Sequence, residues 1–98
     1  MCITCKDGKE AEKISRHLLE KRLIACSNMF PIKSMYWWNG KIVNGNEVVI
    51  IAKTNEKKFS KIEEEVKKLH SYKVPCISRI DVRTNKDCQE WAEKEMNL

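Results

Sequence analysis

The sequence predicts an α+β fold with the element order β-α-β-β-α-β and a C-terminal helix. Two segments, residues 8–22 and 55–69, place apolar residues at helical spacing, and strand-like apolar runs flank both of them. A chain of 98 residues is about the size of one domain, so we expect a single domain over residues 1–98. This order is typical of the split β-α-β arrangement, a four-stranded antiparallel sheet with helices on one face.

The helices are predicted from their caps and apolar stripes. Asp7 followed by Glu10 indicates a helix N-cap with a capping box. The first helix then has the apolar stripe Ala11, Ile14 and Leu18. The second helix has a stripe of the same period, formed by Phe59, Ile62, Val66 and Leu69. A last helix is expected after a capping residue, Thr84 or Asn85.

The strands are predicted at residues 1–5, 23–38, 47–54 and 75–82. Pro31 suggests a bend within the second of these runs, because proline cannot donate to a sheet ladder. Asn39-Gly40 is a strong hairpin signal. The polar residues 43–46 interrupt the next run, and they either continue the turn or mark a bulge.

The predicted sheet has a second face that no helix covers. That face is expected to carry Trp37, Trp38, Val49 and Ile51. A small domain does not ordinarily leave such an apolar patch in water, so we expect the chain to self-associate.

Composition excludes several classes of protein. No apolar run approaches 18 residues, so a membrane span is not expected. The N-terminus has no charged segment followed by an apolar one, which indicates a cytoplasmic protein without a secretory signal. Five cysteines are an odd number, and reduced thiols are expected. The net charge of +5 favours anionic partners in general, but acids interleave with the bases as on an ordinary solvated surface.

Motifs for catalysis or nucleic-acid binding are not found. No Ser-His-Asp signature or phosphate-binding glycine loop is present, so an enzyme is not expected. RNA-recognition domains share this element order, but they stack bases on aromatic residues of a central strand. The run 47–54 contains no aromatic residue, so no nucleic-acid partner is expected.

Two features have a weak metal-binding signature. Cys2-x-x-Cys5 resembles half of a zinc site, but no second pair follows, and in a strand the two residues point to opposite faces. His70 lies near the end of the second predicted helix, where the helix dipole alone favours a histidine. Imidazole and thiolate both bind copper and zinc, so His70 with a nearby thiol is a candidate site.

Several segments resemble one family. The stretch from Tyr36 to Ile42 (Tyr-Trp-Trp-Asn-Gly-Lys-Ile), with Glu47 and Lys53-Thr54 after it, is similar to the Y-x-W-x-G-K-I…E…K-T signature of the CutA divalent-cation tolerance proteins. Thr4 and Asp7 match its T-x-x-D segment, and residues 18–26 resemble its L-x-E-x-x-L-A-A-C run. His70-x-Tyr72-x-x-Pro75 resembles its H-P-Y-E-x-P-E motif, and Trp91 matches a tryptophan of its last helix.

The resemblance implies a ferredoxin-like fold assembled as a homotrimer. It also implies a non-enzymatic protein that binds copper or another divalent metal ion and contributes to metal tolerance. His70, and less directly Cys26, are the metal ligands that the resemblance suggests, although a strand cysteine is more often a small core residue. Four positions depart from the family motifs: Ile3, Ser71, Lys73 and Cys76.

The resemblance further implies a cleft between subunits. Its lining residues are expected to be Tyr36, Trp38, Lys53, Tyr72 and Glu47. Lys53 suits an anionic ligand, although Glu47 can instead pair with it, and the three aromatic residues can serve trimer packing. The alternative function is therefore a signalling-type trimer that binds a small anionic metabolite or a protein partner at this cleft.

Overall fold

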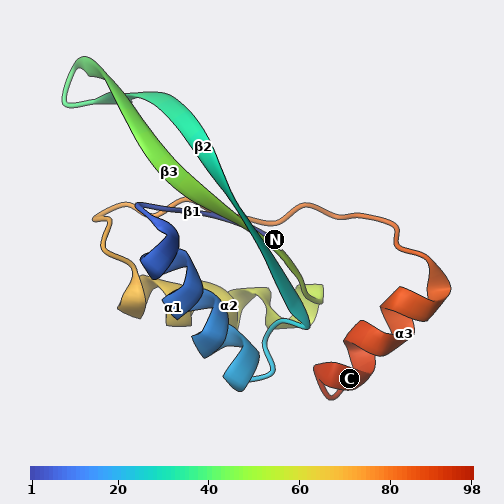
Figure 1. Ribbon diagram of the computed structural model, residues 1–98. Coiled ribbons are helices and arrows are strands. Elements are labelled where there is room, and N and C mark those ends of the chain that lie inside the picture. The colour runs from blue at the N-terminus through green and yellow to red at the C-terminus, as the bar shows by residue number, and fades with distance from the viewer.

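One four-stranded antiparallel sheet organises the chain, and two helices pack on one of its faces (Figure 1). The structure is a computed structural model that describes residues 1–98. Its elements are β1 (Cys2–Cys5), α1 (Gly8–Glu20), β2 (Cys26–Trp38), β3 (Lys41–Lys53), the 3₁₀ turn η1 (Glu56–Lys58), α2 (Phe59–Leu69), β4 (Ile77–Ser78) and α3 (Lys86–Glu95). The strand order β2-β3-β1-β4 confirms the predicted ferredoxin-like arrangement with its additional C-terminal helix.

The core lies between the sheet and the two helices. The predicted stripes face it: Ala11, Ile14 and Leu18 of α1 are wholly buried, as are Ile62 and Val66 of α2. Phe59 and Leu69 complete the α2 stripe at the core margin. The sheet contributes Ile3, Cys5 and Ile50 from its central strands. Twelve residues make up this core, which is thin for 98 residues.

The β2–β3 hairpin is longer than predicted and unbroken. Its register runs from Cys26 opposite Lys53 to Trp38 opposite Lys41 without an extra residue on either strand, so residues 43–46 are neither a turn nor a bulge. Pro31 does not interrupt the strand, because it pairs with Val48 within the continuous register. β2 is the edge strand of the sheet, and proline is tolerated where its nitrogen faces away from the ladder.

Two strand boundaries also differ from the prediction. Residues 23–25 are not in β2, because the chain turns after α1 with Arg22 at a positive φ of 59°. The predicted strand 75–82 is reduced to the two residues of β4, whose partners are Cys2 and Ile3 of the four-residue β1. A short central strand can pair only a short edge strand, so the chain beyond Ser78 continues without sheet hydrogen bonds.

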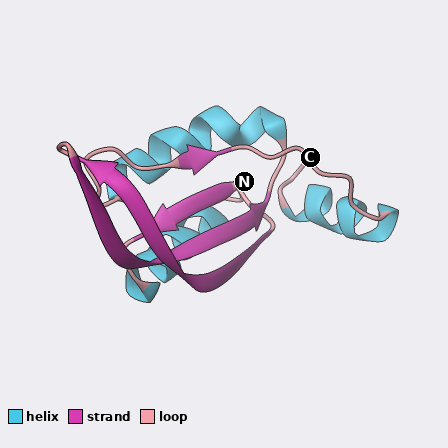
Figure 2. Cartoon of the chain, turned by 90° about the horizontal axis from the view of Figure 1, so that it is seen from above, coloured by secondary structure: helices cyan, strands magenta, loops and turns pink.

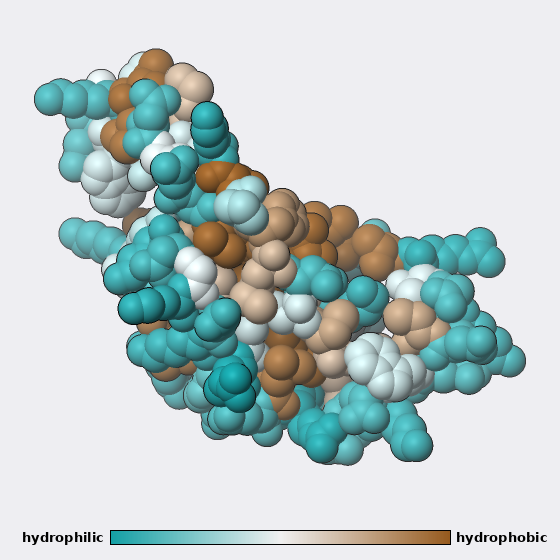
Figure 3. Space-filling view, viewed as in Figure 1, coloured by the Kyte–Doolittle hydropathy of each residue, from teal (hydrophilic) through white to brown (hydrophobic).

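The hairpin extends beyond the core and exposes apolar side chains. Its tip rises away from β1 and from both helices (Figure 1). Met35 is 73% exposed and Trp37 is 71% exposed, and brown hydrophobic atoms gather at this tip (Figure 3). Of the four residues predicted for the open face, Trp37, Trp38 and Ile51 are exposed, whereas Val49 is buried.

The C-terminal helix stands apart from the helical layer. In both ribbon views α3 is joined to the sheet by a long extended segment, residues 79–85 (Figures 1 and 2). Arg22 anchors it by donating to the backbone oxygen and the carboxylate of Glu95, at 3.0 and 2.9 Å. Ala92 and Met96 are its buried residues. No helix of the structure is both long and apolar enough to span a bilayer.

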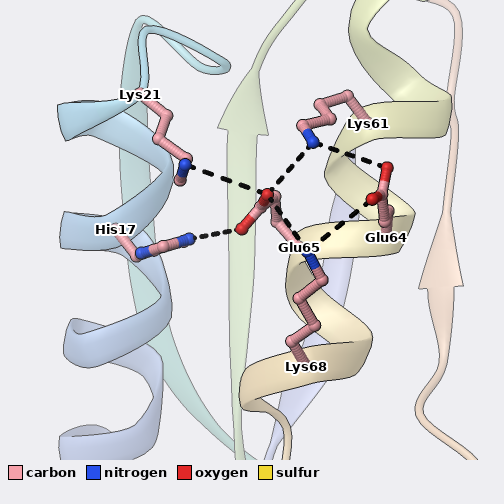
Figure 4. Close-up of polar contacts among 6 residues, drawn as sticks. All are labelled: His17, Lys21, Lys61, Glu64, Glu65 and Lys68. Atoms are coloured by element: carbon pink, nitrogen blue, oxygen red, sulfur yellow. Dashed lines mark hydrogen bonds and ion pairs between the residues drawn. The ribbon is translucent and has the colours of Figure 1, made fainter.

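A nearly buried carboxylate joins α1 to α2. Glu65 Oε2 lies 2.7 Å from Nε2 of His17, and three lysines surround its other oxygen (Figure 4). These are Lys21, Lys61 and Lys68, at 3.9, 3.3 and 3.7 Å. The hydrogen bond from His17, aided by the lysines and opposed by desolvation, lowers the pKa of Glu65 to about 2. His17 therefore links α1 to α2 through the carboxylate of Glu65.

We predict that Glu65→Gln lowers the free energy of unfolding at pH 7. Because the folded-state pKa lies below the ordinary value of 4.5, the carboxylate stabilises the fold above pH 4.5, and this contribution is lost as the pH falls toward 2. The difference between the wild-type chain and Glu65→Gln should therefore shrink over that range. Urea unfolding from pH 7 to pH 2 measures it, with Glu63→Gln, which makes no ion pair, as the control. A pH-independent difference would contradict this prediction.

Candidate functional site

Three side chains with metal-ligating atoms converge beside the end of β1. Cys5 comes from β1, Glu10 from the first turn of α1, and His70 from the residue after α2. One ligand atom of each lies within 4.8 Å of the others, and all three are buried. The β1–α1 turn and the end of α2 meet at this edge of the core, so residues distant in sequence become neighbours.

Both ring nitrogens of His70 make hydrogen bonds. The helix ends at Leu69, and His70 has an extended backbone, with φ −72° and ψ 137°, that turns its ring inward. Nε2–H donates to the carbonyl oxygen of Thr4 at 2.7 Å, while Nδ1 accepts from the N–H of Tyr72 at 3.0 Å. These partners require the neutral ring protonated at Nε2. Nδ1 also lies 3.7 Å from Oε1 of Glu10.

Glu10 connects two loops through backbone donors. Asp7 caps the helix by accepting from the N–H of Glu10 at 2.9 Å, as the capping signal predicts. The Glu10 carboxylate accepts from the N–H of Lys6 at Oε1 and from the N–H of Ser71 at Oε2, both at 3.0 Å. Burial opposes ionisation, but the bonds from Ser71 and Lys6 outweigh it and lower the pKa of Glu10. The side chain is therefore a buried anion.

Cys5 is the thiol of this cluster. Its side chain is wholly buried and makes no hydrogen bond. Burial, together with the carboxylates of Glu10, Asp7 and Glu47, raises the pKa of Cys5 to about 12. At neutral pH it is a protonated thiol, which is a poor nucleophile.

A second polar pair adjoins the cluster. The hydroxyl of Tyr72 donates to Oε2 of the buried Glu47 at 2.6 Å, and the rings of Tyr72 and His70 lie 4.8 Å apart. Burial raises the pKa of Tyr72, and Glu47 adds to this shift, as does the more distant Tyr36. Of the five predicted cleft residues, the structure brings only Tyr72 and Glu47 into contact, while Tyr36 lies on the same face of the hairpin, four residues nearer the tip.

The remaining predicted residues lie elsewhere in the subunit. Cys26, half-buried, pairs with Lys53 at the far end of β3, whereas Thr4, the partner of His70, pairs with Val49. Four strand residues separate these points, or roughly 13 Å. Lys53 and Trp38 lie at opposite ends of the hairpin, roughly 40 Å apart along it. Within one chain His70 therefore does not meet Cys26, and Lys53 does not meet Trp38, while Glu47 pairs with Tyr72 instead of Lys53.

Lys53 borders a separate cavity of about 570 Å³. The cavity lies between the end of β3, the extended segment 79–84 and α3. Its lining includes Cys2, Ile80, Val82, Cys88 and Met96.

Two residues of the cluster, Cys5 and Glu10, were not predicted from the sequence as site residues. Cys5 has the spacing of half a zinc site with Cys2, but it points to the core while Cys2 points away. Glu10 has the signature of a helix cap, and its carboxylate does reach a preceding N–H. Its second bond, to Ser71, depends on a contact across 61 residues that no local pattern reveals.

Comparison with known proteins identifies the family. The model of the CutA1 divalent ion tolerance protein family matches residues 1–95. The chain belongs to the CutA1 family. The divalent-cation tolerance protein CutA of Archaeoglobus fulgidus is 46% identical over 93 residues, covering 94% of this chain and 91% of that protein. The corresponding protein of Thermococcus kodakarensis is 45% identical over 89 residues, covering 90% of this chain and 86% of its own length.

A solved CutA structure agrees over the whole fold. The structure described as the periplasmic divalent cation tolerance protein CutA from Archaeoglobus fulgidus has a TM-score of 0.95. It is 45% identical and covers 97% of this chain and 94% of its own. The family resemblance stated from the motifs is confirmed, and the protein is a member of a divalent-cation tolerance family.

We predict that Ser71→Pro destabilises the fold by about 1–3 kcal/mol, because proline has no N–H and leaves the buried Oε2 of Glu10 without its donor. The extended backbone of His70 tolerates a following proline, so the lost donor is the main effect. Ser71→Ala keeps the N–H, so it should destabilise the fold less than Ser71→Pro does. Urea unfolding at a fixed chain concentration checks both, and equal stabilities for the two variants would contradict the role given to this bond.

Proposed function

We propose that this chain is a non-enzymatic, trimeric CutA-type protein that binds copper or another divalent metal ion and contributes to metal-ion tolerance. The observation that carries the proposal is its similarity, over nine-tenths of its length or more, to proteins named for divalent-cation tolerance. We take residues 1–98 as one domain of that kind.

The exposed hairpin supports the trimer. Met35, Trp37 and Ile42 are all more than half exposed near its tip, and a soluble subunit does not ordinarily leave such a patch in water. The outer edge of β2 is unpaired, and the segment 79–84 makes no backbone hydrogen bond in its own subunit. An assembly between copies would cover the outer edge of β2, the unpaired segment 79–84 and the apolar tip of the hairpin.

We predict that the double variant Met35→Lys, Trp37→Lys dissociates the assembly. The wild-type particle should have three times the 11.5 kDa chain mass. The two lysines would place charge on the apolar hairpin tip, so the variant should have the single-chain mass. Multi-angle light scattering after size exclusion measures it. Leu19→Lys, on an exposed position of α1, is the control and should stay trimeric. A wild-type particle of single-chain mass would contradict the trimer.

Metal binding is proposed at His70. Its ring lies beside a thiol and a carboxylate, the donor types that bind copper and zinc. Cys26 can take part only at a different site, or with His70 of another subunit, because of their separation within one chain. The departures at Ile3, Ser71, Lys73 and Cys76 leave His70 as the proposed ligand that matches the family motif.

We predict that calorimetric titration of the reduced protein with copper or zinc gives one ion per subunit, and that His70→Gln weakens binding at least tenfold. Glutamine keeps an N–H that can donate to Thr4, so the fold and the trimer should persist; circular dichroism and light scattering check this. Gln89→Ala, on the exposed face of α3, is the control. No binding to the wild-type chain would overturn the metal role.

One observation favours the alternative, a signalling-type trimer that binds a small anionic metabolite. Tyr72 and Glu47 form a hydrogen-bonded pair beside the middle of the hairpin, on the face that also carries Tyr36 nearer the tip, where a neighbouring subunit would close the space. In this alternative Lys53 and Trp38 would come from other subunits. A thermal-shift screen with anionic metabolites becomes decisive if the metal titration is negative.

A cytoplasmic location forms part of the proposal. All five cysteines are free in the structure, which suits a reducing compartment. The Archaeoglobus relative is described as periplasmic, so fractionation of cells expressing the untagged chain is the direct test.

A further inference from the structure

We propose that Cys5, Glu10 and His70 form a buried site for one thiophilic d¹⁰ divalent cation, Cd²⁺ or Zn²⁺, in each subunit. The proposal deepens the proposed function, on which it rests, by assigning the ligands within one chain. It differs from the pair predicted from the sequence, because the thiol is Cys5 and the third donor is a carboxylate of α1.

The donor set suits a soft cation of tetrahedral preference. One sulfur, one oxygen and one imidazole nitrogen lie within 4.8 Å of each other, with Nδ1 of His70 and Oε1 of Glu10 at 3.7 Å. Zinc bonds of about 2.0–2.3 Å place tetrahedral ligand atoms roughly 3.4 Å apart, so a contraction of at most about 1.4 Å closes the set. Three protein ligands also leave a fourth position free for water or another ligand.

The imidazole is already oriented for coordination through Nδ1. Metal-bound histidines commonly donate their other ring N–H to a backbone carbonyl, which fixes the ring and its tautomer. Here Nε2–H donates to the Thr4 oxygen at 2.7 Å, which makes Nδ1 the nitrogen with the lone pair, 3.7 Å from Oε1 of Glu10. In the metal-free chain that lone pair accepts the N–H of Tyr72, and a cation at Nδ1 takes its place.

The charge of the pocket favours a cation. Glu10 and Glu47 are both buried, and neither pairs with a lysine or arginine. Glu10 lies on the same side of the sheet as the Cys5 thiol, whereas Glu47, next to the Cys5 partner Val48, points to the other face of the sheet. Both carboxylates accept hydrogen bonds but face no positive charge, so a bound cation adds an attraction that the metal-free chain lacks.

The thiol is the group without a partner. Cys5 is wholly buried and makes no hydrogen bond, although it faces two polar groups of the cluster. On binding, Sγ loses its proton to solvent and forms the metal–sulfur bond, so one proton is released per ion and no electron is transferred. The remaining thiols lie on other elements or on the other face of β1.

Cadmium titration of a chain with Cys5 as its single thiol tests the site. In that chain Cys2, Cys26, Cys76 and Cys88 are replaced by serine, and a thiolate-to-cadmium charge-transfer band in the ultraviolet reports the Cys5–metal bond. We expect one Cd²⁺ per subunit with the band at full intensity. Cys5→Ser in the same background should abolish the band, and Glu10→Gln should weaken binding at least tenfold. Glu12→Gln, on the exposed side of α1, should bind as the parent does.

The outcomes separate this site from the function on which it rests. A folded single-thiol chain without the band overturns the Cys5 site, as does undiminished binding by Glu10→Gln. If the wild-type chain still binds one ion and loses it in His70→Gln, the proposed function survives that failure. If the wild-type chain binds no ion, both proposals fall. Circular dichroism identifies a Cys5→Ser chain that does not fold, and Glu10→Gln then decides.

Discussion

The mismatch in length between the hairpin and the rest of the sheet is the constraint from which most of the structure follows. β2 and β3 pair over 13 residues each, while β1 has four residues and β4 has two. Only the base of the hairpin can therefore rest on the helices. The remaining length has no core to cover, and its methionine and tryptophan side chains are in water in the isolated subunit. The same mismatch limits β4 and leaves the segment before α3 extended and unpaired.

In contrast to the exposed tip of the hairpin, the polar cluster around His70 is buried. Glu10, Glu47 and His70 are held by six hydrogen bonds, three of which come from or go to the backbone of the β1–α1 turn and helix start: the Lys6 N–H, the Asp7 cap and the Thr4 carbonyl. The others join the loop after α2 to the same cluster. A thin core with this many buried polar groups gains order from directional bonds as well as from apolar contact. Cation binding at Nδ1 would exchange one of those bonds, at Tyr72, for a coordinate bond.

Sequence patterns predicted the fold well because its helices and hairpin are encoded locally. The stripes of α1 and α2, the Asp7 cap and the Asn39-Gly40 turn depend on neighbours only a few residues away. The errors concern tertiary context. Pro31 is harmless only because β2 is an edge strand, and the short β4 follows from the length of β1. In the site, His70 and Tyr72 were found through their motif, whereas Cys5 and Glu10 needed contacts across more than 60 residues.

The bond between Glu10 and Ser71 has an evolutionary consequence. The family motif that this chain resembles has proline where Ser71 stands, and a proline cannot donate the hydrogen bond that the buried carboxylate receives here. A glutamate acquired at position 10 in a proline-containing ancestor would have had one buried oxygen without a donor. Proline at position 71 combined with glutamate at position 10 is therefore expected to be less stable than the pairing of serine and glutamate found here.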